Sequence, residues 1–122
     1  MPKHILSVGN CSYDFSTLTQ ALQEKFEVTL QNVDTAHEAE KAIANHQFDL
    51  ILVNRLFDIN QDSGIALIKK LKDQKLSTPM MLISNFPESQ TEAVSVGAVP
   101  GFGKKAVGTP EMLKLVGKYL SK

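Results

Sequence analysis

Three short, nearly all-apolar runs stand out along the chain, at residues 5–8, 49–53 and 80–83. Such runs are typical of strands buried on both faces of a parallel sheet. Two further segments are less apolar: residues 27–31 alternate polar and apolar side chains, and residues 99–104 contain a proline and two glycines. We expect these two to be edge strands, where half-exposure and a missing N–H are tolerated.

Between these segments, apolar residues recur three or four positions apart, which is the spacing of one buried helix face. The pattern covers Phe15, Leu18, Leu22 and Phe26, then Ala36, Ala39 and Ile43, and then Ile65, Ile68 and Leu71. Thr35 and Glu38 have the spacing of a capping box, and Thr109 followed by Pro110 is a typical helix start. Gly97 is expected to end a short fourth helix.

Strands that alternate with helices predict an α/β three-layer sandwich, because crossovers between parallel strands are right-handed. Of the two common doubly wound orders, 2-1-3-4-5 places the second and fifth strands at the edges. We therefore expect a doubly wound five-stranded parallel sheet of that order, in a single domain over residues 1–122. The winding reverses between the first and third strands, so Gly9, Asn10 and Asn54 are expected to line a crevice there.

The composition argues against some classes of function. The chain has 13 Lys plus Arg against 13 Asp plus Glu, so no net charge favours direct binding of nucleic acid or anionic lipid. Cys11 is the single cysteine, which excludes an internal disulfide and fits a reducing compartment. The first apolar run is too short for a secretory signal or a membrane span. We expect a cytoplasmic protein with no membrane association.

The strand ends carry residues that resemble, in order and spacing, the receiver domains of bacterial two-component response regulators, whose fold is flavodoxin-like or CheY-like. Residues 5–10 resemble an apolar strand that, in this family, ends in two acidic residues. Residues 48–54 resemble the family's strand that ends in the phosphoacceptor aspartate. Residues 62–64 resemble the loop before the third helix. The resemblance implies that Ser84 and Lys104 occupy positions that contact phosphoryl oxygens, although a shift of one residue would put Lys105 in the lysine position.

The three carboxylate positions of that family hold Gly9, Asn10 and Asn54 in this chain. In the family a carboxylate attacks phosphorus, while Mg²⁺ held by the acidic pair neutralises the transferring oxygens. An amide such as Asn54 is uncharged and a poor nucleophile, and Mg²⁺ usually requires one or two carboxylates. We therefore expect no phosphorylation, no metal, no cofactor and no enzymatic activity. Restoring all three acids is expected to restore Mg²⁺ binding.

Without those acids, Lys104 would be an unpaired cation in the crevice. Burying an uncompensated lysine is costly, so we expect its amine to turn to solvent, to bond the Asn54 carbonyl, or to pair with Asp58 or Asp14. Asn10 and Asn54 are expected to form a hydrogen-bonded amide pair that holds the loops. A weak anion site formed by Lys104 and Ser84 is a further hypothesis.

The leading hypothesis is a phosphorylation-independent pseudo-receiver of two-component, or phosphorelay, signal transduction that binds a protein partner. The partner would be a histidine kinase, another signalling domain or a second copy, bound through the fourth helix, fifth strand and fifth helix. The apolar arc of the last helix is wider than one buried face requires, which makes Leu115 and Tyr119 candidate interface residues. Two alternatives are a flavodoxin-like binder of nucleotide or flavin at residues 9–12, and an active phosphoacceptor that uses Asp58.

Overall fold

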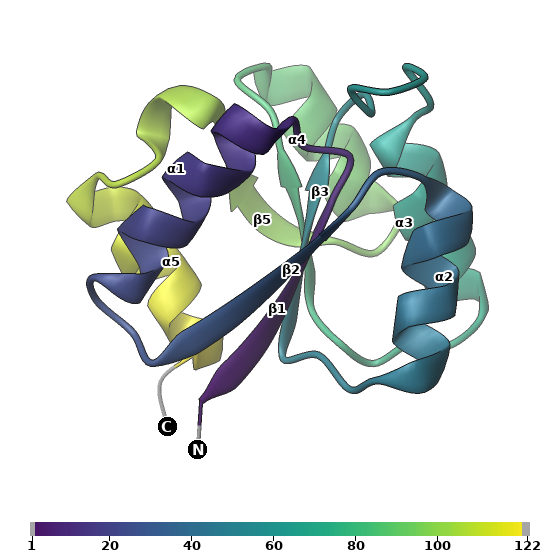
Figure 1. Cartoon of the computed structure of the whole chain (residues 1–122). Helices are drawn as coiled ribbons and strands as arrows, with labels where there is room; N and C mark the ends of the chain where they lie inside the picture. The colour runs from purple at the N-terminus through teal and green to yellow at the C-terminus, as the bar shows by residue number, and fades with distance from the viewer. Residues whose placement is uncertain (1, 121–122) are drawn as a thin grey trace.

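Each strand of the sheet is followed by a helix, and all the strand pairs are parallel (Figure 1). The computed structural model describes residues 2–120. In chain order the elements are β1 (Lys3–Val8), α1 (Ser12–Gln23), β2 (Val28–Val33), α2 (Ala36–Asn45), β3 (Leu50–Asn54), α3 (Gly64–Asp73), β4 (Met80–Ile83), α4 (Pro87–Ser95), β5 (Val99–Phe102), the 3₁₀ turn η1 (Lys104–Ala106) and α5 (Pro110–Leu120). The sheet order is β2-β1-β3-β4-β5, which confirms the predicted doubly wound topology.

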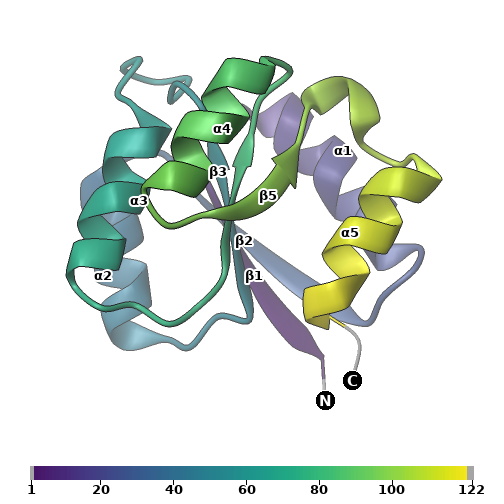
Figure 2. The same cartoon turned by 180° about the vertical axis from the view of Figure 1, so that it is seen from behind.

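Helices cover both faces of the sheet, so the domain has three layers. Figures 1 and 2 show α1 and α5 on one face and α2, α3 and α4 on the other. Successive residues of β1 alternate between the two sides: Ile5 belongs to the core under α1 and α5, and Leu6 to the core under the other helices. Every residue of β3 is buried, as its apolar sequence predicts.

The last strand ends earlier than its sequence suggests. β5 stops at Phe102, and Lys104 begins the 3₁₀ turn instead of ending the strand. Met81 pairs with Val99 whereas Ile83 pairs with Phe102, so β5 contains one more residue than β4 over the same length. This irregularity accounts for the one-residue ambiguity in the resemblance near Lys104.

The helix ends follow the predicted signals with small shifts. The Thr35 hydroxyl accepts a hydrogen bond from the Glu38 N–H at 3.1 Å, while the Glu38 carboxylate accepts one from the Asp34 N–H at 2.9 Å. Helix α1 ends at Gln23, so Phe26 lies beyond the helix on which its spacing placed it and still packs against the core. No helix within residues 2–120 is both long and apolar enough to cross a membrane.

Candidate functional site

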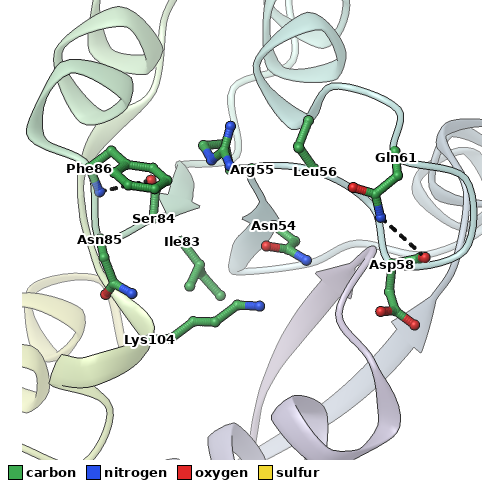
Figure 3. Close-up of a pocket in the computed structure, with 10 residues that line it drawn as sticks. All are labelled: Asn54, Arg55, Leu56, Asp58, Gln61, Ile83, Ser84, Asn85, Phe86 and Lys104. Carbon is green, nitrogen blue, oxygen red and sulfur yellow. Dashed lines mark hydrogen bonds between the residues drawn. The ribbon is translucent and has the colours of Figure 1, made fainter.

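A crevice of about 280 Å³ opens at the carboxyl ends of β3 and β4, beside the start of η1 (Figure 3). Its walls consist of Asn54, Arg55, Leu56, Asp58, Gln61, Ile83, Ser84, Asn85, Phe86 and Lys104. Three of the predicted site residues, Asn54, Ser84 and Lys104, therefore meet there. Gly9 does not line this crevice, and Asn10 lines an adjoining cavity that shares Ile83 and Lys104 with it.

Gly9 is absent from the crevice wall because Phe57 covers it. The Phe57 side chain is completely buried, and a Cβ added to Gly9 would lie 2.2 Å from its Cδ1 atom. The backbone of Gly9 has a φ of +77°, which disfavours residues other than glycine. Its carbonyl oxygen accepts hydrogen bonds from the Asn54 side-chain amide at 3.0 Å and from the Asp58 N–H at 2.9 Å. A buried aromatic ring thus occupies the space next to position 9.

Asn10 belongs to a closed chain of polar groups beside β2. Its amide donates to the Ser7 hydroxyl at 2.8 Å, Ser7 donates to the Asn32 side-chain oxygen at 2.9 Å, and the Asn32 amide donates to the Asn10 carbonyl at 3.1 Å. The predicted Asn10–Asn54 amide pair is wrong, because each amide bonds elsewhere. The Asn10 amide nitrogen is thus held by Ser7, whereas its side-chain oxygen is buried without a hydrogen-bond partner among the described residues.

The opposite wall, from β4 and η1, is more open. The Ser84 hydroxyl oxygen accepts the Phe86 N–H at 3.1 Å, which leaves its own proton free to donate (Figure 3). The Lys104 ammonium lies 2.9 Å from the Asp14 carboxylate of α1, one of the partners that the sequence suggested. Lys104, and not Lys105, lines the crevice.

Arg55 is the residue that sequence reasoning missed. It follows Asn54 directly, and its guanidinium lies 4.8 Å from the centre of the Phe86 ring. Within residues 2–120, neither an ion pair nor a side-chain hydrogen bond holds this guanidinium. The signal was present in the sequence, since an arginine directly after a buried strand at the switch point must lie at the rim of the crevice.

The site does not fit the Mg²⁺ ion that the resemblance implies. Asn10 and Asn54 offer neutral amides, and the Gly9 carbonyl already accepts two hydrogen bonds. In the described part of the chain, no group of three or more His, Cys, Asp or Glu side chains could hold a metal ion. A hard divalent cation that gives up water reluctantly finds no set of oxygen ligands here.

The candidate interface residues of α5 are only partly accessible. Leu115 and Tyr119 are half-buried and pack against the core under α1 and α5. Among residues 2–120, the exposed large apolar side chains are Tyr13, Ile59, Phe86 and Val94. The wide apolar arc of α5 is therefore largely used by the core.

No family model matches the sequence, and no curated protein matches it. Several solved structures do match the fold. A candidate response regulator from Chloroflexus aurantiacus has a TM-score of 0.85 and 17% identity over 100% of both chains. A CheY-like receiver domain protein from Methanospirillum hungatei has a TM-score of 0.78 and 19% identity, over 98% of this chain and 94% of that one.

NtrX from Brucella abortus has a TM-score of 0.83 and 20% identity, and the match covers 98% of this chain. The same match covers only 27% of the longer NtrX chain. At these sequence identities, the similarity to the solved structures establishes the fold alone. The chain has the fold of response regulator receiver domains, as the order of its strand-end residues suggested.

Proposed function

We propose that residues 1–122 form a single pseudo-receiver domain of two-component signalling, which works without phosphorylation by binding a protein partner. The observation that carries the proposal is the packing of Phe57 against Gly9. A receiver that transfers phosphate requires acidic side chains and a metal at this end of the sheet. Here glycine and a buried ring fill one position, and amides fill the other two.

The test is exposure of the purified protein to acetyl phosphate and Mg²⁺, followed by intact mass spectrometry. We expect no change of mass, because Asn54 provides no anionic nucleophile and its amide nitrogen is bonded to the Gly9 carbonyl. The gain of one phosphoryl group that hydroxylamine removes would contradict the proposal, whichever residue carried it.

The alternative phosphoacceptor, Asp58, has one observation in its favour: it lines the same crevice as Ser84 and Lys104. Its side chain is exposed on the loop after β3, and its backbone N–H is bonded to the Gly9 carbonyl. Asp58→Asn serves as the matched variant in the acetyl phosphate experiment. A phosphoryl adduct on the wild type that disappears in this variant would establish Asp58 as the acceptor.

The structure offers no observation in favour of a flavin or nucleotide. At the start of the loop that would cradle a phosphate, the Gly9 N–H is already used, since it donates to the Val33 carbonyl at 2.8 Å. The Asp14 N–H lies 3.4 Å from the Cys11 sulfur, which caps α1.

We propose that the partner binds on the side of α4, β5 and α5. A shallow groove there is lined by Gln90, Thr91, Val94, Pro100 and Gly101, and Val94 is 43% exposed. Val94→Glu and Tyr119→Glu should weaken self-association in sedimentation velocity, or pull-down of a histidine kinase, without changing the far-UV spectrum. Tyr13→Glu is the control, since Tyr13 is 77% exposed and belongs to α1, which is not one of these three elements. Equal loss in all three variants would contradict the assignment.

A further inference from the structure

The two edges of the sheet are protected to different extents. β2 and β5 are the outer strands. Along β5, Pro100 has no N–H, the Gly101 N–H donates to the Gln90 side chain at 3.2 Å, and the pairing with β4 is irregular. Proline, irregular pairing and covering side chains are means by which proteins prevent an edge strand from pairing with another chain. β5 is therefore a guarded edge.

The edge formed by β2 lacks these protections. β2 has six residues whereas β5 has four, and its sequence contains neither a proline nor a charged residue. Its register with β1 is regular from Val28 to Val33. Figure 1 shows β2 at the front of the view, with no other segment drawn across its outer side. A regular and uncharged edge strand of this kind can pair with a strand of another molecule.

The hydrogen bonds between β1 and β2 determine which residues of β2 face inward. The Lys3 N–H donates to the Glu27 carbonyl at 3.0 Å, and the Gly9 N–H donates to the Val33 carbonyl at 2.8 Å. Because the register between these two points is regular, the odd-numbered residues of β2 direct their backbone groups at β1. The backbone groups of the even-numbered residues therefore point away from the sheet.

The outward-pointing backbone groups belong to Val28, Leu30 and Asn32. Among the described residues, the hydrogen bond made to these groups comes from the Gln23 side chain, which donates to the Val28 carbonyl at 3.2 Å. A carbonyl oxygen has two lone pairs, so this one can accept a second hydrogen bond. The edge thus offers an N–H and a C=O group at every second residue from 28 to 32.

We propose that a second copy of this chain pairs with β2 in the antiparallel direction, across a two-fold axis at Leu30. The outward residues are symmetric about position 30, so Leu30 would face Leu30 of the second copy, and Val28 would face Asn32. Each of these pairs exchanges two hydrogen bonds, which gives about six in total. A shift of one residue would bring the outward groups against groups already bonded to β1, and a shift of two would lose a pair.

The side chains fit the same register. Val28 and Leu30 lie on the face covered by α1, so the two Leu30 side chains would make an apolar contact across the axis. On the other face, Thr29 would lie opposite Gln31 of the second copy, and both are exposed and uncharged. Each copy contributes the same residues, so the contact closes as a dimer. The inference does not depend on the proposed function, because α4 and β5 lie at the other edge.

The experiment is sedimentation equilibrium, in which the wild type should show a reversible monomer–dimer equilibrium. Thr29→Lys with Gln31→Lys, the like-charge variant, sets lysine opposite lysine twice and should weaken dimerisation about tenfold. Thr29→Glu with Gln31→Lys, the opposite-charge variant, should dimerise at least as tightly as the wild type. Both variants lose the Thr29 hydroxyl that lies 2.6 Å from the His4 Nδ1 atom, so this loss is common to the two.

The matched control is Thr91→Lys with Ser95→Lys on α4. It adds the same charge at two exposed positions that do not belong to β2. Its dimerisation should equal that of the wild type, because the pairing depends on charge at the β2 edge and not on the net charge of the chain.

Amide hydrogen exchange of the wild type gives a second readout, which remains informative if a variant fails to fold. The N–H groups of Leu30 and Asn32 should exchange more slowly as the protein concentration rises, because the second copy accepts their hydrogen bonds. The N–H of Gln31 faces β1 and should be protected at every concentration.

Several results would overturn the inference. They are a monomer at millimolar concentration, exchange at Leu30 and Asn32 that is independent of concentration, association that continues beyond a dimer, and equal losses in the like-charge variant and the α4 control. Self-association that is lost in Val94→Glu and Tyr119→Glu but kept in the like-charge variant would place the contact at the other edge. None of these results changes the outcome of the acetyl phosphate experiment, so the dimer and the pseudo-receiver proposal are tested separately.

Discussion

The two walls at the carboxyl ends of the strands differ in how open they are. The wall formed by the ends of β1 and β3, beside the crevice, is closed: Phe57 covers Gly9, and the amide nitrogens of Asn10 and Asn54 are bonded within the fold. The wall from β4 and η1 is open, and Ser84 and Lys104 still face the crevice. Glycine at position 9 and amides at positions 10 and 54 are therefore parts of one packed wall.

Phe57 makes this packing hard to change. A ring that is completely buried contributes to the core, and the space it fills exists because position 9 carries no side chain. The sequence alone suggested that restoring three acids would restore Mg²⁺ binding. The structure leads to a different prediction, since a side chain at position 9 would meet the Phe57 ring.

The largest change in stability is expected from Phe57→Ala. Removal of a fully buried aromatic ring leaves a cavity and should lower the free energy of unfolding by about 3–5 kcal/mol. Chemical denaturation measures it. Ile59→Ala in the same loop is the control, because Ile59 is 63% exposed and should change stability by less than about 0.5 kcal/mol. Similar values for the two variants would show that the ring does not hold this wall.

Gly9→Ala should lower the free energy of unfolding by about 1–3 kcal/mol. The added methyl group would contact Phe57, and the backbone at position 9 is left-handed. Gly108→Ala separates the two causes, because Gly108 has a φ of +87° with nothing within 4 Å of an added Cβ. It should show the backbone cost alone. In a Phe57→Ala background, the cost of Gly9→Ala should fall toward that of Gly108→Ala. Additive costs in this double-mutant cycle would contradict the contact.

The variant Gly9→Asp, Asn10→Asp, Asn54→Asp should remain unable to bind Mg²⁺ in calorimetry, or should lose its fold. The Asp side chain at position 9 would have to displace Phe57. Addition of Phe57→Ala to the triple variant tests whether the ring is the obstacle. Mg²⁺ binding by the triple variant with Phe57 in place would show that the wall adapts freely.

The two walls also differ in how much of their structure can be predicted from the sequence. The strand order and the buried strands could be predicted, because apolar runs and helical spacing report burial directly. The positions of Asn54, Ser84 and Lys104 at one edge follow from parallel topology. The role of Phe57 could not be predicted, since its contact with Gly9 joins two loops far apart in the sequence. The pairing of Arg55 with Phe86 likewise depends on a tertiary approach that no local pattern encodes.

A smaller effect is expected at the open wall. The Lys104–Asp14 pair is partly exposed, with 44% and 26% of the two side chains accessible. Lys104→Gln should therefore cost less than about 1 kcal/mol at low salt, and less still at high salt, because solvent and ions screen such pairs. Denaturation at two salt concentrations measures it. A loss as large as that of Phe57→Ala would show that the ion pair, and not the buried ring, maintains the crevice.

The smallest change in stability is expected at the Lys70–Glu40 ion pair between α3 and α2. This pair lies away from the crevice, so it serves as the reference for the Lys104 variant. The hydrogen bond from Lys70 holds the pKa of Glu40 below its ordinary value of 4.5, although burial acts in the opposite direction. A carboxyl whose pKa is lower in the folded state adds stability above its ordinary pKa, and this is lost as the pH falls through the folded value. Lys70→Gln should thus cost about 0.5 kcal/mol at neutral pH and nothing once Glu40 is protonated in both states. Urea denaturation along a pH series measures the difference, and a cost that persists in acid would mean that Lys70 acts through packing of its stem and not through its charge.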